Sequence, residues 1–363
     1  MATGTNLRYQ WQSRSASGTT WKKIDKATKS RYTAKASAWG NRTRFRVVVT
    51  ADGGKVVSRE ARLTVLYPSK TPAADAEARF GLSGLTQGVD LSAYQYVPGK
   101  RVSMAAIDTW AGPDGFALHR LASGARPIYQ KYTDLCTGDA RKTGSKPVTI
   151  DCAYGVFADK FAAARLQTGH YWFNGWIKSI DNTSKQLFAG GYTPTASAKQ
   201  FVAWLLADGH YTKSSTDPLV LDIEPGRSWT KYDKDKKYVR TLRAWKPAEA
   251  LEFLTTVRSL LTEAGYHANL YVYMSANEVA ALDSGGFKWR EVAAQARLWV
   301  AYWGIDNGRI PDVQPWIGPW TEQGGWSIWQ YSSNLRISGS NVGAIDANIA
   351  HADAWTPRAP SVP

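Results

Sequence analysis

The sequence predicts a small all-β sandwich followed by a larger β/α (TIM-like) barrel. The first 70 of the 363 residues hold 15 Lys and Arg but only three acids, so they carry +12 of the chain's formal charge of +15. From about residue 80 onward, apolar strand patterns alternate with helical patterns, which is typical of a parallel sheet that closes into a barrel. Because charge and pattern both change in the same region, we expect a multidomain protein.

The composition excludes several classes of protein. With 44% hydrophobic and 21% charged residues, the chain is an ordinary globular sequence rather than a disordered one. No apolar run approaches the roughly 18 residues that a membrane-spanning helix needs. Two cysteines exclude a disulfide scaffold and a four-cysteine zinc site, and with five histidines we expect no metal site. The positive charge predicts an anionic partner such as nucleic acid, acidic lipid or an acidic cell-wall polymer.

Residues 1–67 are predicted to form β-hairpins. RFRVVVTA and KVVSREA alternate apolar and polar residues on either side of an Asp-Gly turn. The segments YQWQSRSASGTTWKKI and FRVVVTADGGKVVSREARLTV resemble a bacterial immunoglobulin-like (Ig-like) module, which implies a sandwich but no activity. The first strand is expected almost at Met1, which suggests that the domain is truncated at its start. No signal-peptide pattern precedes it.

Residues 68–79 are Pro/Ala-rich and are predicted to be a linker, and the barrel is expected over residues 80–357. The expected barrel strands are 88–92, 127–132, 168–173, 218–223, 269–274, 297–302, 327–332 and 342–346. The expected helices are 156–167, 195–208, 247–264 and 290–296.

Cys136 and Cys152 flank a polar, Gly-rich insertion that reads as a loop. In an oxidising compartment we favour a disulfide between them, with two free thiols as the alternative.

Four carboxylates are the candidate catalytic groups. Asp90, Asp222, Glu224 and Asp346 each follow an apolar strand run, and in β/α barrels the chemistry takes place at the carboxyl ends of the strands. Asp222 and Glu224 are two residues apart, so both should face the same side of one strand. Like charges buried together raise the pKa of one carboxyl group, as a general acid requires. The alternative is an ordinary solvated strand end or a helix-capping acid.

Aromatic residues are abundant near the end of the chain, where six of the 17 tryptophans lie between Trp299 and Trp329. Such side chains stack on sugar rings, although core packing is an equal alternative for each of them.

At these residues the chain resembles glycoside hydrolase family 25, the Chalaropsis-type lysozymes. The motifs that carry the resemblance occur in family order: GVDLSAYQ at 88–95, GHYWFN at 169–174, PLVLDIEPG at 218–226, LWVAYWG at 298–304, WSIWQYSS at 326–333 and VGAIDANI at 342–349. The resemblance implies an N-acetylmuramidase (lysozyme) that cleaves the β-1,4 bond between N-acetylmuramic acid and N-acetylglucosamine in peptidoglycan. It implies no metal and no cofactor.

The resemblance also implies roles for individual residues. Glu224 is expected to be the general acid, and Asp222 to assist the substrate's 2-acetamido group. Asp90 and Asp346 are expected to contact substrate or water and to help keep Glu224 protonated. The residues expected to line the saccharide groove are Tyr94, Tyr171, Trp303, Trp329, Gln330 and Tyr331.

Two motif positions depart from the family pattern. Trp172 stands where the family often has histidine, and Ala347 stands where it has leucine, while Asn348 is kept. The regions 97–125, 134–155 and 226–246 are also unusual in length or composition, which leaves the subsites open.

The sequence therefore predicts a peptidoglycan hydrolase that acts on the bacterial wall, either encoded by a phage (an endolysin or a virion-associated lysozyme) or extracellular. Its expected partners are peptidoglycan and anionic wall polymers. The alternative is an inactive wall-binding or structural virion protein. Nucleic-acid binding is disfavoured because the chain has no helix-turn-helix, zinc or single-strand-binding signature. The oligomeric state is left open.

Overall fold

The computed structural model describes residues 5–15, 18–34, 43–63, 71–97, 100–123, 149–151, 153–173, 177–180, 193–225, 227–233, 236–242, 244–340 and 343–358. The chain divides into two compact units, Met1–Lys70 and Thr71–Pro363. Cys136 and Cys152 lie outside the described residues, so their pairing stays a prediction.

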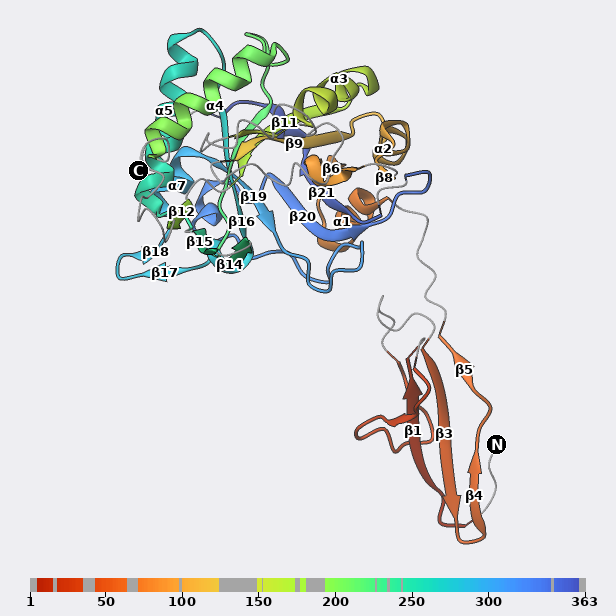
Figure 1. Cartoon of the computed structure of the whole chain (residues 1–363). Helices are drawn as coiled ribbons and strands as arrows, with labels where there is room; N and C mark the ends of the chain where they lie inside the picture. Colours follow the sequence, from red (N-terminus) through yellow and green to blue (C-terminus); the bar gives the residue numbers. More distant parts are fainter. Residues whose placement is uncertain are drawn as a thin grey trace. The chain divides into compact units, whose positions relative to one another are not determined.

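The first unit contains one antiparallel sheet with the strand order β2-β1-β3-β4, and β5 also pairs with β3 (Figure 1). The strands are β1 (Arg8–Arg14), β2 (Lys22–Lys23), β3 (Arg44–Ala51), β4 (Gly54–Val57) and β5 (Ala61–Arg62). The predicted Asp-Gly hairpin is confirmed, because Ala51 pairs with Gly54 across the turn. An Ig-like sandwich would need a second sheet, so it stays a prediction.

The second unit is built around a closed barrel of eight strands. In spatial order they are β6 (Leu85–Leu91), β9 (Phe116–Ser123), β11 (Gln167–Phe173), β13 (Pro218–Asp222), β16 (Asn269–Ser275), β19 (Arg297–Ala301), β20 (Ile328–Leu335) and β21 (Ile345–His351). The strands from β6 to β20 run parallel to their neighbours. The predicted barrel is therefore confirmed, although its second strand, β9, was expected at 127–132 and its last strand differs from the expected one.

The last strand, β21, closes the barrel in the opposite direction. It pairs antiparallel with both β20 and β6. The expected strand at 342–346 is therefore displaced, because β21 begins at Ile345 and continues to His351.

Side chains fill the barrel interior and the space outside its wall. On β13, Val220 packs inside with Phe116 and Tyr271, whereas its neighbours Leu219 and Leu221 pack outside. This alternation follows from the two-residue period of a strand.

Helices cover the outside of the barrel wall (Figure 1). They are α1 (Pro72–Phe80), α2 (Met104–Ala111), α3 (Tyr154–Ala164), α4 (Pro194–Asp208), α5 (Pro247–Glu263), α6 (Ala276–Val279) and α7 (Arg290–Gln295). The helices expected at 195–208, 247–264 and 290–296 are confirmed to within one residue at each end, and the one expected at 156–167 begins and ends slightly earlier. None of the described helices is both long and apolar enough to cross a membrane.

The remaining elements are short strands and 3₁₀ turns. They are η2 (Ala93–Gln95), β7 (Tyr96–Val97), β8 (Lys100–Arg101), β10 (Thr149–Ile150), β12 (Ile177–Ile180), β14 (Arg227–Asp233), β15 (Lys236–Leu242), β17 (Leu282–Asp283), β18 (Gly286–Phe287), η5 (Gly318–Gln323) and η6 (Ala352–Trp355).

The expected linker is largely wrong, because helix α1 occupies most of residues 68–79. The Oγ1 atom of Thr71 accepts a hydrogen bond from the Ala74 amide at 3.3 Å, and Pro72 occupies the first turn, where its missing N–H costs nothing. Ala73 and Ala76 are buried in the core of the second unit. The Pro/Ala composition that resembles a linker is therefore also that of a capped, Ala-rich helix.

Two regions that were set aside as unusual in the sequence contain regular structure. Residues 97–125 include α2 and the barrel strand β9, and residues 226–246 include the antiparallel pair β14 and β15. The strand expected at 127–132 lies outside the described residues. β9 is missed from the sequence because His119 and Arg120 interrupt its apolar run.

We predict that Gly88→Ala strongly destabilises the barrel. A Cβ atom at Gly88 would lie 2.2 Å from the Phe116 carbonyl oxygen and 2.5 Å from the Phe116 ring, where β6 meets β9. Overpacking of this kind costs about 3 kcal/mol. In the matched control Gly155→Ala, on α3, the new Cβ meets only an Asp208 oxygen at 3.5 Å. Chemical denaturation should show a large loss of unfolding free energy for the first variant only, and equal stabilities would contradict the packing described.

Candidate active site

A pocket opens where the carboxyl ends of the parallel strands meet. It encloses about 620 Å³, including space open to solvent. Every strand of the barrel contributes to it, either directly or through a residue just beyond its end. Its lining consists of Asp90, Ser92, Arg120, Tyr171, Phe173, Asp222, Glu224, Tyr273, Trp299, Trp303, Gln330 and Asp346.

The pocket brings together all four predicted carboxylates. Asp222 is the last residue of β13 and is 5% exposed, while Glu224 lies two residues further on and is half-buried. The expectation that these two carboxylates face one space therefore agrees with the structure, since both line the pocket. Their catalytic roles are taken up below as a proposal.

Asp346 reaches the pocket by a different route from the one expected. It is the second residue of β21 rather than the end of a preceding strand. Because β21 is antiparallel, its first residues lie beside the carboxyl ends of its neighbours, and Asp346 pairs directly with Asp90 on β6. The reversed direction of the closing strand thus places two acids opposite each other.

Asp90 is held by a chain of hydrogen bonds. Its Oδ2 atom accepts bonds from the side-chain amides of Asn348 at 2.8 Å and Gln330 at 2.9 Å. The amide oxygens of these two residues accept bonds from the indole N–H groups of Trp299 at 2.8 Å and Trp303 at 3.0 Å, respectively. An indole can only donate, so each amide must turn its NH₂ group toward Asp90. The orientation of both amides is therefore fixed.

The surroundings of the acids raise their pKa values. Burial, and to a smaller extent the charge of Glu224, raise the pKa of Asp90 to about 6 against the lowering effect of its two amide donors. Burial, followed by the charges of Asp90, Asp306 and Glu224, holds the pKa of Asp346 well above its usual value. Burial and the nearby carboxylates also raise the pKa of Tyr273, whose hydroxyl donates to Gln330 at 2.9 Å. The surroundings therefore shift all three side chains toward their protonated forms, relative to their ordinary pKa values.

Arg120 is a pocket residue that the sequence reasoning missed. It lies on β9, and its guanidinium bonds to Asp151 at 2.7 Å in a pair that is almost fully buried. The Asp151 carboxylate also accepts bonds from the backbone amides of Ala93, at 3.1 Å, and Ala153, at 2.9 Å. This ion pair therefore links the pocket wall to η2 and to the start of α3. Recognising β9 would have found Arg120, because it lies two positions beyond the inward-facing Leu118.

Three of the expected saccharide-binding residues line the pocket: Tyr171, Trp303 and Gln330. Trp303 is 38% exposed, so part of its ring is open to a ligand. Tyr171 is mostly buried, and its hydroxyl donates to the Leu91 carbonyl at 3.1 Å. Tyr94 lies in η2, and its side chain is outside what the structure describes.

Trp329 and Tyr331 are wrong as groove residues. Both are fully buried in the core outside the barrel wall, where the Trp329 ring packs against Phe80 and Trp326. Gln330, which lies between them on β20, faces the pocket, so the strand period sends its two neighbours to the other side.

Trp172, which stands where the family often has histidine, likewise does not line the pocket. Trp172 is fully buried outside the barrel wall against Phe201, Trp204 and Phe253. Ala347 is buried in the same core, whereas Asn348 bonds to Asp90.

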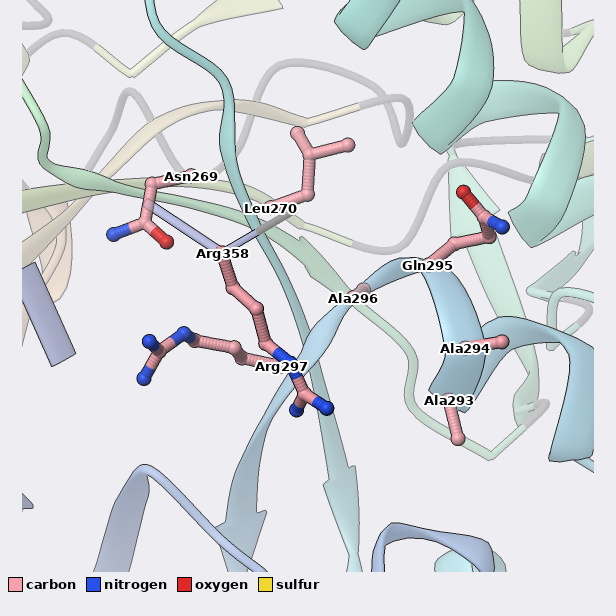
Figure 2. A pocket seen from close by; sticks show the side chains of 8 residues that line it. All are labelled: Asn269, Leu270, Ala293, Ala294, Gln295, Ala296, Arg297 and Arg358. Atoms are coloured by element: carbon pink, nitrogen blue, oxygen red, sulfur yellow. The ribbon is translucent and has the colours of Figure 1, made fainter. Parts of the chain in front are cut away.

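A smaller pocket of about 250 Å³ lies at the other end of the barrel, beside the first residues of β16 and β19; Figure 2 shows the residues that line it. Arg297 donates to Asp353 at 3.1 Å and to the Thr356 carbonyl at 3.0 Å, and Arg358 donates to Gln323. These guanidinium groups thus serve contacts within the unit, and the lining contains no acid. We therefore place the candidate active site at the carboxyl ends of the strands.

Within the described residues, no group of three or more His, Cys, Asp or Glu side chains is arranged to hold a metal ion. That the reaction needs no metal or cofactor stays an expectation from the sequence.

The family of the second unit follows from a match to a family model. Residues 162–340 match the model described as "Glycosyl hydrolases family 25". The second unit is therefore a glycosyl hydrolase family 25 domain, and the protein is a glycoside hydrolase. The matched span contains Asp222 and Glu224, while Asp90 and Asp346 lie outside it and join them through the barrel closure.

Three solved structures are similar to this chain at low identity. The catalytic domain of endolysin ply40 from bacteriophage P40 of Listeria monocytogenes is 18% identical, with 75% of this chain and 95% of that chain covered and a TM-score of 0.44. The spore cortex lytic enzyme SleM of Clostridium perfringens is 17% identical, with 74% of this chain and 68% of that chain covered and a TM-score of 0.44. The glycosyl hydrolase 25 GHIP of Streptococcus pneumoniae is 17% identical, with 73% of this chain and 86% of that chain covered and a TM-score of 0.43.

Likenesses this weak carry no argument about activity. A comparison with curated proteins gives no match.

We predict that Asp90→Asn changes how stability depends on pH. The folded-state pKa of about 6 exceeds the ordinary value of 3.8, so between these values the unfolded chain loses a proton that the folded protein keeps. Raising the pH through this window therefore costs wild-type stability, by up to about 3 kcal/mol for this group. Denaturation at pH 4 and pH 7 should show the variant gaining stability relative to wild type as the pH rises.

The control is Glu322→Gln, which removes an exposed acid far from the pocket lining. Its stability difference from wild type should be the same at both pH values. An equally constant difference for Asp90→Asn would mean that the pKa of Asp90 is not raised.

Proposed function

We propose that this glycoside hydrolase is a lysozyme that cleaves the β-1,4 bond between N-acetylmuramic acid and N-acetylglucosamine in peptidoglycan. The observation that carries the proposal is the convergence of four carboxylates on one pocket at the mouth of a family 25 barrel. The aromatic side chains beside them support a sugar substrate, because Trp303 offers an exposed ring and Tyr171, Phe173 and Tyr273 complete the wall.

Glu224 is the general acid of the proposed reaction. It is the more exposed member of the Asp222–Glu224 pair, so a bound saccharide can reach it. Its carboxyl group donates a proton to the glycosidic oxygen as the bond to the anomeric carbon breaks, which turns the departing sugar into a neutral alcohol.

Asp222 assists the substrate's own nucleophile. Its buried carboxylate orients the N–H of the 2-acetamido group, so that the acetamido oxygen bonds to the anomeric carbon as the leaving group departs. Water then attacks this carbon while its bond to the acetamido oxygen breaks and a proton of the water passes to Glu224, so the configuration at the anomeric carbon is retained. The depth of Asp222 at the end of β13 supports this role, because a buried carboxylate interacts more strongly with a developing positive charge.

Asp90 and Asp346 have a supporting role. Four carboxyl groups facing one pocket repel one another when they are ionised, so a proton is most readily kept on the acids whose pKa values are raised. Any of them that is ionised repels a second negative charge in the pocket and so helps to keep Glu224 protonated, and their carboxyl groups form hydrogen bonds to the sugar or to water.

A phage-encoded lysin, a virion-associated lysozyme and an extracellular enzyme would all hydrolyse the wall in this way. We therefore propose the reaction and its substrate, and not one of these three roles. The competing function is an inactive wall-binding or structural protein, which would keep the barrel and its pocket but release no sugar.

We predict that the wild-type protein releases reducing ends from purified bacterial walls and that Glu224→Gln lowers this rate at least about 100-fold, because the amide cannot supply the proton. The assay should use walls of several chemotypes. Glu322→Gln is the matched control, since it removes an exposed carboxyl group outside the pocket, and its rate should remain at the wild-type level. Both variants should keep the wild-type melting temperature.

Absence of reducing ends from every chemotype would contradict the proposed substrate. A Glu224→Gln variant that retains activity would show instead that another group supplies the proton.

A further inference from the structure

The sheet of the first unit carries nearly all of its strand cations on one face. In an antiparallel pair, residues directly opposite each other project to the same side, and residues two positions apart on a strand do so as well. The printed registers join seven basic residues into one face: Arg8, Arg14, Lys23, Arg44, Arg46, Lys55 and Arg62. We call this set the basic face. Of the basic residues in strands β1–β5, only Lys22 lies on the other face.

The other face of the sheet is aromatic and apolar. It presents Tyr9, Trp11, Phe45 and Val47, and the ring of Tyr32 packs against both Trp11 and Phe45. The aromatic contacts thus lie on this side of the sheet, whereas the basic face carries the cations together with the buried Val48. Such segregation concentrates a charge of one sign over a small area.

Most of the cations of the basic face have no ion-pair partner among the residues that the structure describes. Glu60 pairs with Arg14 at 3.2 Å and with Arg44 at 2.9 Å. Among the residues that the structure describes, no carboxylate is ion-paired with Arg8, Lys23, Arg46, Lys55 or Arg62. Asp52, a nearby acid, accepts hydrogen bonds from Thr5 and Asn6 instead.

Glu60 offsets only part of the repulsion between the cations of the basic face. Arg44 lies directly opposite Arg14 on one side and Arg62 on the other, and like charges in opposed positions destabilise a sheet. The Trp21 ring helps to order this region, because the Arg46 and Arg14 guanidinium carbons lie 4.2 and 4.9 Å from its centroid. The guanidinium groups of Arg14 and Arg46 are therefore held in place, and of these two only Arg14 is ion-paired with a described carboxylate.

We propose that the basic face binds a phosphate-bearing anionic polymer of the bacterial cell wall and so holds the enzyme on its substrate. Guanidinium groups match phosphate geometry, and a row of cations suits a polymer with regularly repeated anions. The choice of a wall polymer over nucleic acid rests on the proposed function of the second unit. It is also favoured by Trp21, whose ring is engaged by two guanidinium groups rather than left free to stack on bases.

The test compares two full-length variants with the same loss of charge. The face variant carries Arg8→Gln, Lys23→Gln, Lys55→Gln and Arg62→Gln, all at exposed positions of the basic face. The control variant carries Lys22→Gln, Lys26→Gln, Lys29→Gln and Arg31→Gln, which are exposed but lie outside it. Unchanged circular dichroism and a melting temperature no lower than that of wild type establish that both are folded.

Co-sedimentation with purified walls should show at least a tenfold weaker affinity for the face variant and less than a twofold change for the control. Wild-type binding should fall as salt rises from 50 to 500 mM. Removing the phosphate polymers from the walls should bring wild type down to the level of the face variant. Release of reducing ends from these stripped walls should be equal in all three proteins.

Equal wall binding by the two variants would overturn the proposal, since net charge rather than the basic face would then govern it. Binding that survives the stripping, or that is matched by binding to duplex DNA of equal charge, would also overturn it. The release of reducing ends tests the proposed function separately from wall binding. Face-specific binding without any released sugar would sustain the basic face while contradicting the lysozyme proposal.

Discussion

The candidate active site of the second unit depends on a barrel whose closing strand, β21, runs antiparallel to its two neighbours. If β21 ran parallel, its first residues would lie at the other end of the barrel, far from Asp222 and Glu224. Because it is antiparallel, Asp346 faces Asp90, and Asn348, two positions further along, donates a hydrogen bond to the same Asp90. One topological choice therefore supplies the pocket with an acid and with a donor that orients a second acid.

The pocket balances charges that are costly to bury. Two amide donors lower the pKa of Asp90 while burial raises it, and burial has the larger effect. The buried Arg120–Asp151 pair supplies the pocket wall with a cation and anchors it to the backbone of η2 and α3. The charge of the chain is divided in a similar way, since the first unit carries the basic face and the second places its acids around the pocket. We infer that the first unit provides attraction to the wall and the second provides the chemistry.

The sequence predicted the barrel and the Asp222–Glu224 pair because both depend on local pattern, an apolar strand followed by acids two residues apart. It could not reveal the direction of β21, which is set by pairing with β20 and also with β6, more than 200 residues away in the chain. It assigned Trp329 and Tyr331 to the groove because residue type alone does not say which face of a strand is inward. The sequence does not indicate Arg120 because it does not indicate β9. It predicts a linker in place of helix α1 because Pro and Ala are common both in linkers and in the first turns of helices. The errors thus concern strand direction, strand face and segments of ambiguous composition.

The proposed reaction cleaves the glycan after N-acetylmuramic acid. Borohydride reduction of the fragments released from walls, followed by mass spectrometry, identifies the sugar at each new reducing end. We expect N-acetylmuramitol there, with N-acetylglucosamine at the other end of each fragment. Reduced N-acetylglucosamine at the new ends would contradict it, because the enzyme would then cut the other bond of the glycan strand.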